Sequence, residues 1–432
     1  MTASSIDIAG PLFLSYRQND GTSTVASLAR LLRAAGIPVW RDKDDLPPGD
    51  TAGRLSQAIQ AGLSGAVFVV TPDIVNSDVV KGIEAPALIT LHEEDQRFQL
   101  LIANDVATVD GAGLDYGAPD RLLGRVKGEL QKVHQVPASP DGLFGLVQKA
   151  LSHRMVQHRE TVAAAGYFSL TIQTRNVAQV FDRTGAQLDI RVRRSHHEKL
   201  PDAEGLNYLR RTISLLPDAV TSTGATKVRI GGGAHLTVAL ALGAALPSSR
   251  IGQLEVVDHR SDVWASDTEA AIPASPFLEF EQVEHEIVLD RAARPIVAVY
   301  VDLLPTRSDA AFERYLDEYG TTIAAHGVIR SPERGLVDPN RAGVVAAEAV
   351  GLIRQLSAAH TNAQIDLMLA TPFGLAVLIG RLCNTLRIRA FEWDDSDDSV
   401  GLNGDARPRY LPSLSVHASV PTGPITAVLL GS

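Results

Sequence analysis

Residues 13–50 read FLSYRQNDGTSTVASLARLLRAAGIPVWRDKDDLPPGD. Apolar residues recur at helical spacing in the middle of this stretch, between two short segments of strand character. The helical positions are Val25, Leu28, Leu32 and Ala35. Ser23 or Thr24 is the expected N-cap of this helix and Gly36 its expected end. The order strand, helix, strand predicts a βαβ unit that leads into an acidic, proline-broken loop.

Further strands extend this unit into a parallel sheet. Gly65–Val70 is apolar and β-branched, as a buried parallel strand requires, and Phe98–Ile102 predicts another. Ser15, Arg17 and the segment Asp42–Asp50 then gather at the carboxyl ends of the strands, where open α/β sheets bind ligands. The fold class expected for this region is α/β with a flavodoxin-like parallel sheet.

The next segment, Thr71–Leu88, reads TPDIVNSDVVKGIEAPAL. Together with residues 13–50 it resembles a TIR domain (the Toll/interleukin-1 receptor module). TIR domains that consume NAD carry a glutamate shortly after a strand and a serine-containing turn, and Glu84 is the matching position. The resemblance implies that the Glu84 carboxylate binds the nicotinamide ribose and stabilises an oxocarbenium-like transition state without a metal. The NAD-binding residues that it implies are Phe13, Ser15, Arg17, Trp40, Asp45, Leu46 and Ser77.

Structural interpretations of these acids stay open. Glu84 lies three positions from Ala87, four from Val80 and Leu88, and seven from Leu91. It is therefore either an acid on an apolar helical stripe or a half-exposed helix acid. Pro86 interrupts that helix and leaves the direction of the Glu84 side chain undetermined. The acids of the proline-broken loop can equally be solvated. These acids are Asp42, Asp44 and Asp45.

Composition narrows the setting. The chain has 432 residues, enough for two or three domains, and a formal net charge of −10 that disfavours long nucleic acids as partners. The single Cys383 excludes an internal disulfide framework, and the first ten residues lack the features of a signal peptide. The apolar run Leu236–Leu246 is shorter than a membrane span and predicts a buried helix. A cytoplasmic location without membrane attachment is therefore expected.

A domain boundary is expected near His158, after the turn-rich Pro137–Gly142 and a helical pattern that follows it. This places one domain at 1–158 and another at 159–432. The second contains an internal repeat, in which GGGAHLTVALALGAAL from Gly231 aligns with MLATPFGLAVLIGRLC from Met368 at an offset of 137 positions. Strand, turn and helix recur in order, which predicts two Rossmann-like α/β halves at about 159–290 and 291–432.

The duplicated region, from about Phe168 to Ser432, resembles a SAVED domain, a sensor built from two fused CARF-like units. The resemblance rests on the repeat, on ATPFGLAVLIGRL (Ala370–Leu382) and on FEWDD near the end. It implies that a cyclic oligonucleotide of bacterial CBASS antiphage defence binds here as activator, with cyclic oligoadenylate, and specifically cyclic triadenylate, as the expected ligand.

Several residues are candidates for contacting that ligand. The glycines of GGGAH allow backbone N–H groups to approach a phosphate at a helix N-terminus, and RVRRSHHEK is a basic cluster in an acidic protein. The candidates are Arg193, Arg194, Lys199, Gly232, Gly233, His235, Thr371, Pro372, Phe373, Trp393 and Asp394. The alternatives are a solvated strand end for the basic residues, a helix-capping Thr371, and core positions for Phe373 and Trp393.

Other enzyme classes lack their motifs. The chain has no GxSxG elbow, no GxxxxGK[ST] loop and no clustered His and Cys ligands, while His196 and His197 are adjacent and point to opposite faces of a strand. The favoured hypothesis is a cyclic-oligonucleotide-activated NAD hydrolase that works through ligand-induced oligomers or filaments, with Asp45 and Leu46 at the contact between subunits. The main alternative is a non-enzymatic TIR scaffold, which the lack of an aromatic residue just before Glu84 favours. A third is a ring nuclease that degrades its ligand.

Overall fold

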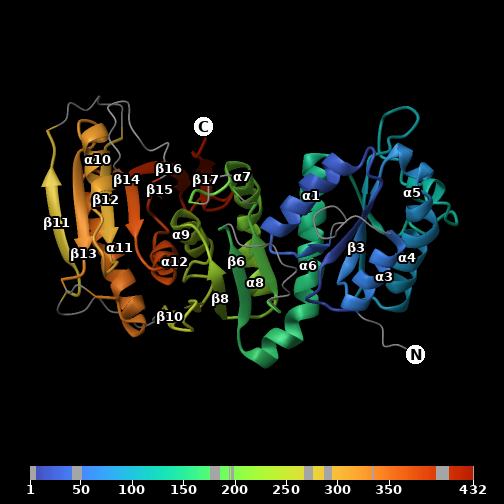
Figure 1. Ribbon diagram of the computed structural model, residues 1–432, viewed down its shortest axis with the longest axis horizontal. Helices are drawn as coiled ribbons and strands as arrows, with labels where there is room; N and C mark the ends of the chain where they lie inside the picture. Colours follow the sequence, from blue (N-terminus) through green and yellow to red (C-terminus); the bar gives the residue numbers. More distant parts are fainter. Residues whose placement is uncertain are drawn as a thin grey trace. The chain divides into compact units, whose positions relative to one another are not determined.

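The computed structural model describes residues 6–40, 51–175, 185–193, 195, 199–266, 276–286, 294–332, 335–395 and 408–431. The chain divides into two compact units (Figure 1). Unit 1 comprises Met1–Gly166, Ala178–Arg191 and Ser222–Gly224, and unit 2 comprises Tyr167–Val177, Val192–Thr221 and Ala225–Ser432.

Unit 1 contains a five-stranded, all-parallel sheet in the order β2-β1-β3-β4-β5. This is the flavodoxin-like order, and it confirms the expected fold class and both predicted inner strands. The strands are β1 (Leu12–Tyr16), β2 (Val39–Trp40), β3 (Gly65–Val70), β4 (Gln99–Asn104) and β5 (His134–Pro137). The helices are α1 (Thr22–Ala34), α3 (Thr51–Ala61), α4 (Ala85–Glu94), α5 (Ala118–Leu122) and α6 (Pro140–Ala165).

Helix α1 begins differently from the sequence expectation. Its N-cap is Gly21, in a helical conformation and without a side-chain cap, so the predicted capping by Ser23 or Thr24 is wrong. The Gly21 N–H donates to the Arg17 carbonyl, so a turn already precedes the helix and leads the chain into it. The predicted end is confirmed, because Gly36 has φ +85°, a left-handed conformation that glycine adopts most readily.

Helix α6 continues beyond the expected domain break at His158 and ends at Ala165, followed by Gly166 in a left-handed conformation. His158 is buried in unit 1, and burial lowers its pKa to about 4. One turn earlier, the guanidinium of Arg154 donates to the carbonyls of Ala9, Gly10 and Gln187, all within unit 1. The helix is therefore part of the first unit along its whole length.

Unit 2 is built from parallel strands flanked by antiparallel ones. The strands β10, β9, β8 and β6 are neighbours in that order, and a seven-stranded sheet has the order β11-β13-β12-β14-β15-β16-β17. The first group is β6 (Phe168–Gln173), β8 (Lys227–Gly233), β9 (Gln253–Val257) and β10 (Val263–Ala265). The second is β11 (Glu279–Glu284), β12 (Ile296–Asp302), β13 (Ala325–Arg330), β14 (Gln364–Ala370), β15 (Ile388–Asp394), β16 (Arg409–Val416) and β17 (Ile425–Val428).

Helices accompany these strands, and β7 (Leu188–Arg191) belongs to unit 1, where it contacts α1. The helices of this part of the chain are α7 (Ala203–Thr212), α8 (Leu216–Ser222), α9 (Leu236–Ala245), α10 (Ala310–Tyr319), α11 (Ala342–Ala359) and α12 (Phe373–Leu382). The segment Pro339–Ala359, which includes α11, is long and apolar enough to cross a membrane, but half of it is buried inside the fold, as in a core helix of a soluble protein.

The internal repeat is confirmed as a repeat of structure. Strands β8 and β14 begin at residues 227 and 364, and helices α9 and α12 begin at 236 and 373, so both pairs are 137 positions apart. Each repeated strand also has a parallel neighbour on both sides. Helices α9 and α12 pack against each other in the middle of unit 2 (Figure 1). The predicted buried helix is confirmed, because all described α9 residues from Thr237 to Ala245 are buried.

Two glycines allow this close helix contact. A Cβ atom on Gly243 would lie 1.9 Å from the Val377 carbonyl oxygen, and one on Gly380 would lie 2.0 Å from that of Leu240. We expect Gly380→Ala to push the helices apart and to lower the free energy of unfolding of unit 2 by about 1–3 kcal/mol. Thermal unfolding of the intact chain measures this change.

Gly351→Ala in α11 is the matched control, because no atom lies within 4 Å of a Cβ built there. Replacing a glycine inside a helix by alanine removes backbone entropy from the unfolded chain, so this variant should be stabilised by up to about 1 kcal/mol. Equal unfolding temperatures for the two variants would contradict the packing argument.

Candidate functional site

A pocket of about 260 Å³ opens in unit 1 near the carboxyl ends of β1 and β2. Its walls come from β1, from the last residue of β2 and from the segment that follows β3. The lining residues are Phe13, Leu14, Tyr16, Arg17, Gln18, Trp40, Ser77, Val79, Val80 and Glu84. Five residues expected at an NAD site thus line one cavity: Phe13, Arg17, Trp40, Ser77 and Glu84.

Glu84 is held firmly in this pocket. It ends the π-helical turn Val80–Glu84, in which the Ala85 N–H reaches back five residues to the Val80 carbonyl. Pro86 follows in the first turn of α4, and its missing N–H explains why regular α-helix begins only here. Glu84 is 6 % exposed, and the Ser15 hydroxyl donates to its Oε2 at 2.5 Å. Its carboxylate is therefore a buried, oriented group and not a half-exposed helix acid.

The aromatic wall of the pocket comes from a distant strand. Trp40, the last residue of β2, lines the cavity together with Glu84. The segment just before Glu84 in sequence has no aromatic residue and contributes Ser77, Val79 and Val80 to the pocket lining. An aromatic surface beside the carboxylate is thus present without a local sequence signal. Stacking on an aromatic ring is a common way to hold a planar heterocycle.

Arg17 contributes a cation to the rim of the same pocket. Its guanidinium forms an ion pair with the Asp73 carboxylate and donates to the Asp73 carbonyl at 2.8 Å. Both side chains are partly exposed, so the pair leaves the guanidinium accessible to a ligand. Asp45 and Leu46, the other residues expected at this site, lie outside the described residues, as do Asp42 and Asp44.

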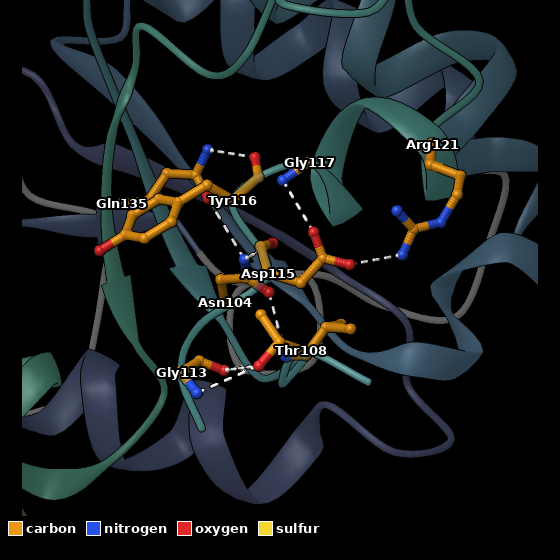
Figure 2. A network of polar contacts seen from close by, with 9 residues as sticks. Asn104, Thr108, Gly113, Asp115, Tyr116, Gly117, Arg121 and Gln135 are labelled. Carbon is orange, nitrogen blue, oxygen red and sulfur yellow. Dashed lines mark hydrogen bonds and ion pairs between the residues drawn. The ribbon is translucent and has the colours of Figure 1, made fainter. Parts of the chain in front are cut away.

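A polar network holds the loop that follows β4 at the same edge of the sheet (Figure 2). Buried Asn104 donates to the Asp115 carbonyl at 2.9 Å and to Gln135 at 3.2 Å. The Asp115 carboxylate accepts from the Gly117 N–H at 2.9 Å and from Arg121 at 2.8 Å, and its pKa is lowered chiefly by the bond to Arg121. Hydrogen bonds from Asn104, the last residue of β4, therefore attach this loop to the sheet.

Unit 2 contains a larger pocket of about 450 Å³. Its walls come from residues at or just beyond the carboxyl ends of the parallel strands of both repeat halves, which is where α/β sheets bind ligands. The lining residues are Arg175, Lys199, His235, Leu236, Tyr300, Leu304, Ser308, Leu369, Ala370, Glu392, Trp393 and Tyr410. Lys199, His235 and Trp393 are the sequence candidates among them.

Glu392 is a buried acid in this pocket. The backbone N–H and the hydroxyl of Thr237 both donate to its Oε1, at 2.9 and 2.6 Å. Thr237 lies in the first turn of α9, so the carboxyl group caps the positive end of that helix. Burial raises the pKa of Glu392 to about 7, although the two Thr237 bonds act in the opposite direction.

His235 is a buried group in the wall of the same pocket. It is 4 % exposed, its Nδ1 is 2.8 Å from the Thr174 hydroxyl, and its ring also interacts with the Lys199 backbone. Burial, assisted by the nearby Arg175, lowers the pKa of His235 to about 4, so the ring is neutral at pH 7.

The glycine turn of GGGAH, Gly231–His235, was expected to bring backbone N–H groups to a phosphate, and the structure differs from this expectation. Gly232 has φ +95°, and a Cβ there would lie 2.2 Å from the Ile172 carbonyl, so the turn does need glycine. However, the His235 N–H already donates to Thr174 and the Thr237 N–H to Glu392. The helix N-terminus is therefore occupied at these two groups and is not open there to a phosphate. Gly232 and Gly233 do not line the pocket in the described part of the chain.

The remaining candidates have mixed placements. Arg193 forms an exposed ion pair with Glu204, Lys199 pairs with Asp395 beside the Trp393 ring, and Arg194, His196 and His197 lie outside the described residues. Asp394 is buried and accepts from Arg409 at 3.1 Å. Pro372 is the N-cap of α12 and Phe373 its first residue, both half-buried. Thr371 is buried and does not cap the helix, and its hydroxyl has no partner among the described residues.

Sequence reasoning missed several residues of this pocket. Arg175 directly follows the turn after β6, Tyr300 lies inside an apolar strand, and Tyr410 belongs to the antiparallel strand β16. Glu392 lies in the FEWDD motif, of which only Trp393 and Asp394 were predicted as ligand contacts. The signal that could have found Arg175 and Glu392 is their position near the ends of parallel strands.

Both units are thus α/β sheets with a pocket at the carboxyl edge of the strands, one with an oriented carboxylate and one with cations, aromatic rings and a buried acid. Comparison with protein families agrees with this division. Residues 12–111 match the TIR domain model, and residues 214–400 match the SAVED model, described as the "SMODS-associated and fused to various effectors sensor domain". The chain therefore joins an N-terminal TIR domain to a C-terminal SAVED sensor domain.

Solved structures with similarity to the chain include Cap4 SAVED/CARF-domain containing receptors. That of Acinetobacter baumannii with the cyclic trinucleotide 3'3'3'-cAAA has 9 % identity and a TM-score of 0.45, and covers 91 % of this chain and 97 % of that one. That of Moraxella osloensis has 11 % identity and a TM-score of 0.40, with 91 % and 98 % covered. No curated protein sequence matches this chain.

Proposed function

We propose that this chain is an NAD hydrolase gated by a cyclic oligonucleotide, in which the TIR domain releases nicotinamide and the SAVED domain senses the activator. The observation that carries the proposal is the unit 1 pocket, where the buried Glu84 carboxylate, oriented by Ser15, lies beside Trp40 and Phe13. An oriented carboxylate next to aromatic surface can hold a nicotinamide riboside and stabilise positive charge on the ribose as the glycosidic bond breaks.

The second pocket supports the sensor role. It combines the cations Arg175 and Lys199 with the rings of Tyr300, Trp393 and Tyr410, and its volume lies in the range of small-molecule sites. Cations bind phosphates and aromatic rings stack on bases, so a compact anionic nucleotide fits the lining. The expected activator is a cyclic oligoadenylate, with cyclic triadenylate as the first candidate.

Control by a small ligand requires that the ligand favours one conformation or assembly of the protein. We infer that the ligand-free chain is inactive and that ligand binding drives oligomers or filaments in the cytoplasm, as an antiphage response that depletes NAD. Asp45 and Leu46 are the proposed contact between neighbouring TIR domains. This part of the proposal comes from the family resemblance.

The experiment that tests the proposal measures NAD loss by the purified chain with a panel of cyclic di-, tri- and tetranucleotides. We expect rapid release of nicotinamide with one member of the panel and none without ligand. Tight ligand binding without NAD loss would instead favour the scaffold function of the TIR domain. Recovery of the ligand intact after long incubation would argue against the ring nuclease.

A further inference from the structure

Glu392 occupies an unusual position in the unit 2 pocket. It is 6 % exposed and lines the cavity, yet within the described residues both hydrogen bonds that its side chain accepts fall on Oε1. Oε2 is therefore the carboxyl atom left for a molecule in the cavity. His235 lines the same cavity, and its ring is held by the Thr174 hydroxyl and the Lys199 backbone.

The lining indicates which part of a nucleotide lies beside Glu392. Phosphates are drawn to Arg175 and Lys199, and an ionised carboxylate repels them. Arg175 and Tyr410 both lie close enough to Glu392 for their charges to interact, and Tyr300 and Trp393 line the same cavity. A base stacked on these rings, with a neighbouring phosphate held by Arg175, can present its edge to Oε2.

We propose that Oε2 of Glu392 reads the 6-position of a bound purine: it accepts from a 6-amino group when the carboxyl is ionised and donates to a 6-oxo group when the carboxyl is protonated. The inference rests on the proposed sensor function and adds to it the base class and its dependence on pH. An ionised carboxylate only accepts hydrogen bonds, whereas a neutral carboxyl group has one O–H donor. With Oε1 held as acceptor by Thr237, the proton of the neutral form is placed on Oε2.

The surroundings permit this titration near neutral pH. Burial raises the pKa of Glu392 to about 7, and the charge of Arg175 opposes that rise. Burial holds His235 neutral, with a pKa of about 4, and burial raises the pKa of both Tyr300 and Tyr410. Burial also raises the pKa of Asp302, whose charge interacts with both tyrosines. Ser413, which contacts the Thr237 hydroxyl, does not titrate. The carboxyl is therefore mostly neutral at pH 6 and mostly ionised at pH 8.

The experiment measures the dissociation constants of cyclic triadenylate and cyclic triinosinate by calorimetry at pH 6 and pH 8. The two ligands differ in a 6-amino or 6-oxo group and in N1, which is an acceptor in adenine and an N–H donor in hypoxanthine. For the unmodified chain we expect the amino ligand to bind about tenfold more tightly than the oxo ligand at pH 8. At pH 6 we expect this preference to shrink or to reverse.

Glu392→Gln is the decisive variant, because an amide keeps an acceptor for Thr237 and places a permanent N–H donor at the Oε2 position. We expect it to favour the oxo ligand at both pH values. Glu348→Gln is the matched control, since Glu348 is also buried and accepts two backbone N–H groups, from Phe277 and Leu278, but does not line the pocket.

Two results would overturn the inference: an equal amino-to-oxo ratio at both pH values in the unmodified chain, or a Glu392→Gln chain that keeps the original pH-dependent ratio. If neither cyclic ligand binds the unmodified chain at either pH, the inference fails together with the sensor function of this pocket for purine ligands. Binding without selectivity overturns only the inference, so the two failures are distinguishable. Because the unmodified chain carries the pH test, the result does not depend on the folding of a variant.

Discussion

Glu84→Gln is expected to lower the ligand-activated rate of NAD loss by at least about 10²-fold, while ligand binding and assembly are retained. The reason is electrostatic: the buried carboxylate, held by Ser15 at 2.5 Å, is the negative group of the pocket that can stabilise an oxocarbenium-like ribose, and an amide is neutral. The measurement is the initial rate of nicotinamide release at saturating activator, with activator binding measured in parallel.

Glu93→Gln is the matched control, because Glu93 is an exposed acid of the neighbouring helix α4 and should behave as the unmodified chain. If Glu84→Gln released nicotinamide as fast as this control, Glu84 would not be the catalytic carboxylate. A chain that assembles normally but shows no NAD loss even with Glu84 intact would instead be a TIR scaffold.

Ser15→Ala separates orientation from charge. It keeps the Glu84 carboxylate but removes the hydroxyl that donates to Oε2, so we expect a loss of about tenfold, well below that of Glu84→Gln. An unchanged rate would mean that the observed hydrogen bond does not position the carboxylate during turnover.

The combined substitution Arg175→Glu and Lys199→Glu is expected to weaken binding of the activator by about 10²-fold or more. Both cations line the unit 2 pocket, and a charge-assisted bond to phosphate is worth about 1.5–3 kcal/mol before the new repulsion is added. NAD loss should then require a correspondingly higher activator concentration, with the same rate at saturation. Titration of the rate against activator concentration measures both quantities.

The control replaces two exposed cations of the same unit, Arg210→Glu and Arg260→Glu, and changes the net charge by the same amount. Only the pocket variant should shift the activation curve. Equal shifts for both double variants would show that the overall charge of the unit, and not contact in the pocket, attracts the ligand. Raising the salt concentration should weaken binding to the unmodified chain more than to the pocket variant.

Much of the fold follows from local pattern. The alternation of apolar strands and amphipathic helices between Phe13 and Ile102 was enough to predict the parallel sheet of unit 1. The spacing of apolar residues that marks a helix or a strand can be read within a single segment. The repeat beginning at Gly231 and Met368 predicted two equivalent halves. When a strand and the helix after it recur at the same offset, the two halves have the same number of residues between these elements and can form the same substructure. Glu84 was identified through the resemblance of Thr71–Leu88 to TIR domains that consume NAD, which carry a glutamate shortly after a strand and a serine-containing turn.

Other features could not be found in this way. The cap of α1 depends on a turn formed by Arg17 and Gly21, and the continuation of α6 past the expected break goes with the burial of His158 and Val162. Arg175 and Tyr410 meet in one pocket although 235 positions separate them, counted from 175 to 410. Sequence motifs report neighbours along the chain, whereas a pocket collects neighbours in space.

The sequence by itself determined the two α/β parts, the duplication of the second and the choice of Glu84, because strand and helix periodicity and short motifs are local. Only the tertiary structure decided that Trp40 supplies the aromatic wall beside Glu84, that Thr237 occupies one oxygen of Glu392, and that Glu392 is buried. These features depend on which distant segments exclude water from a group, and that is a property of the packed chain.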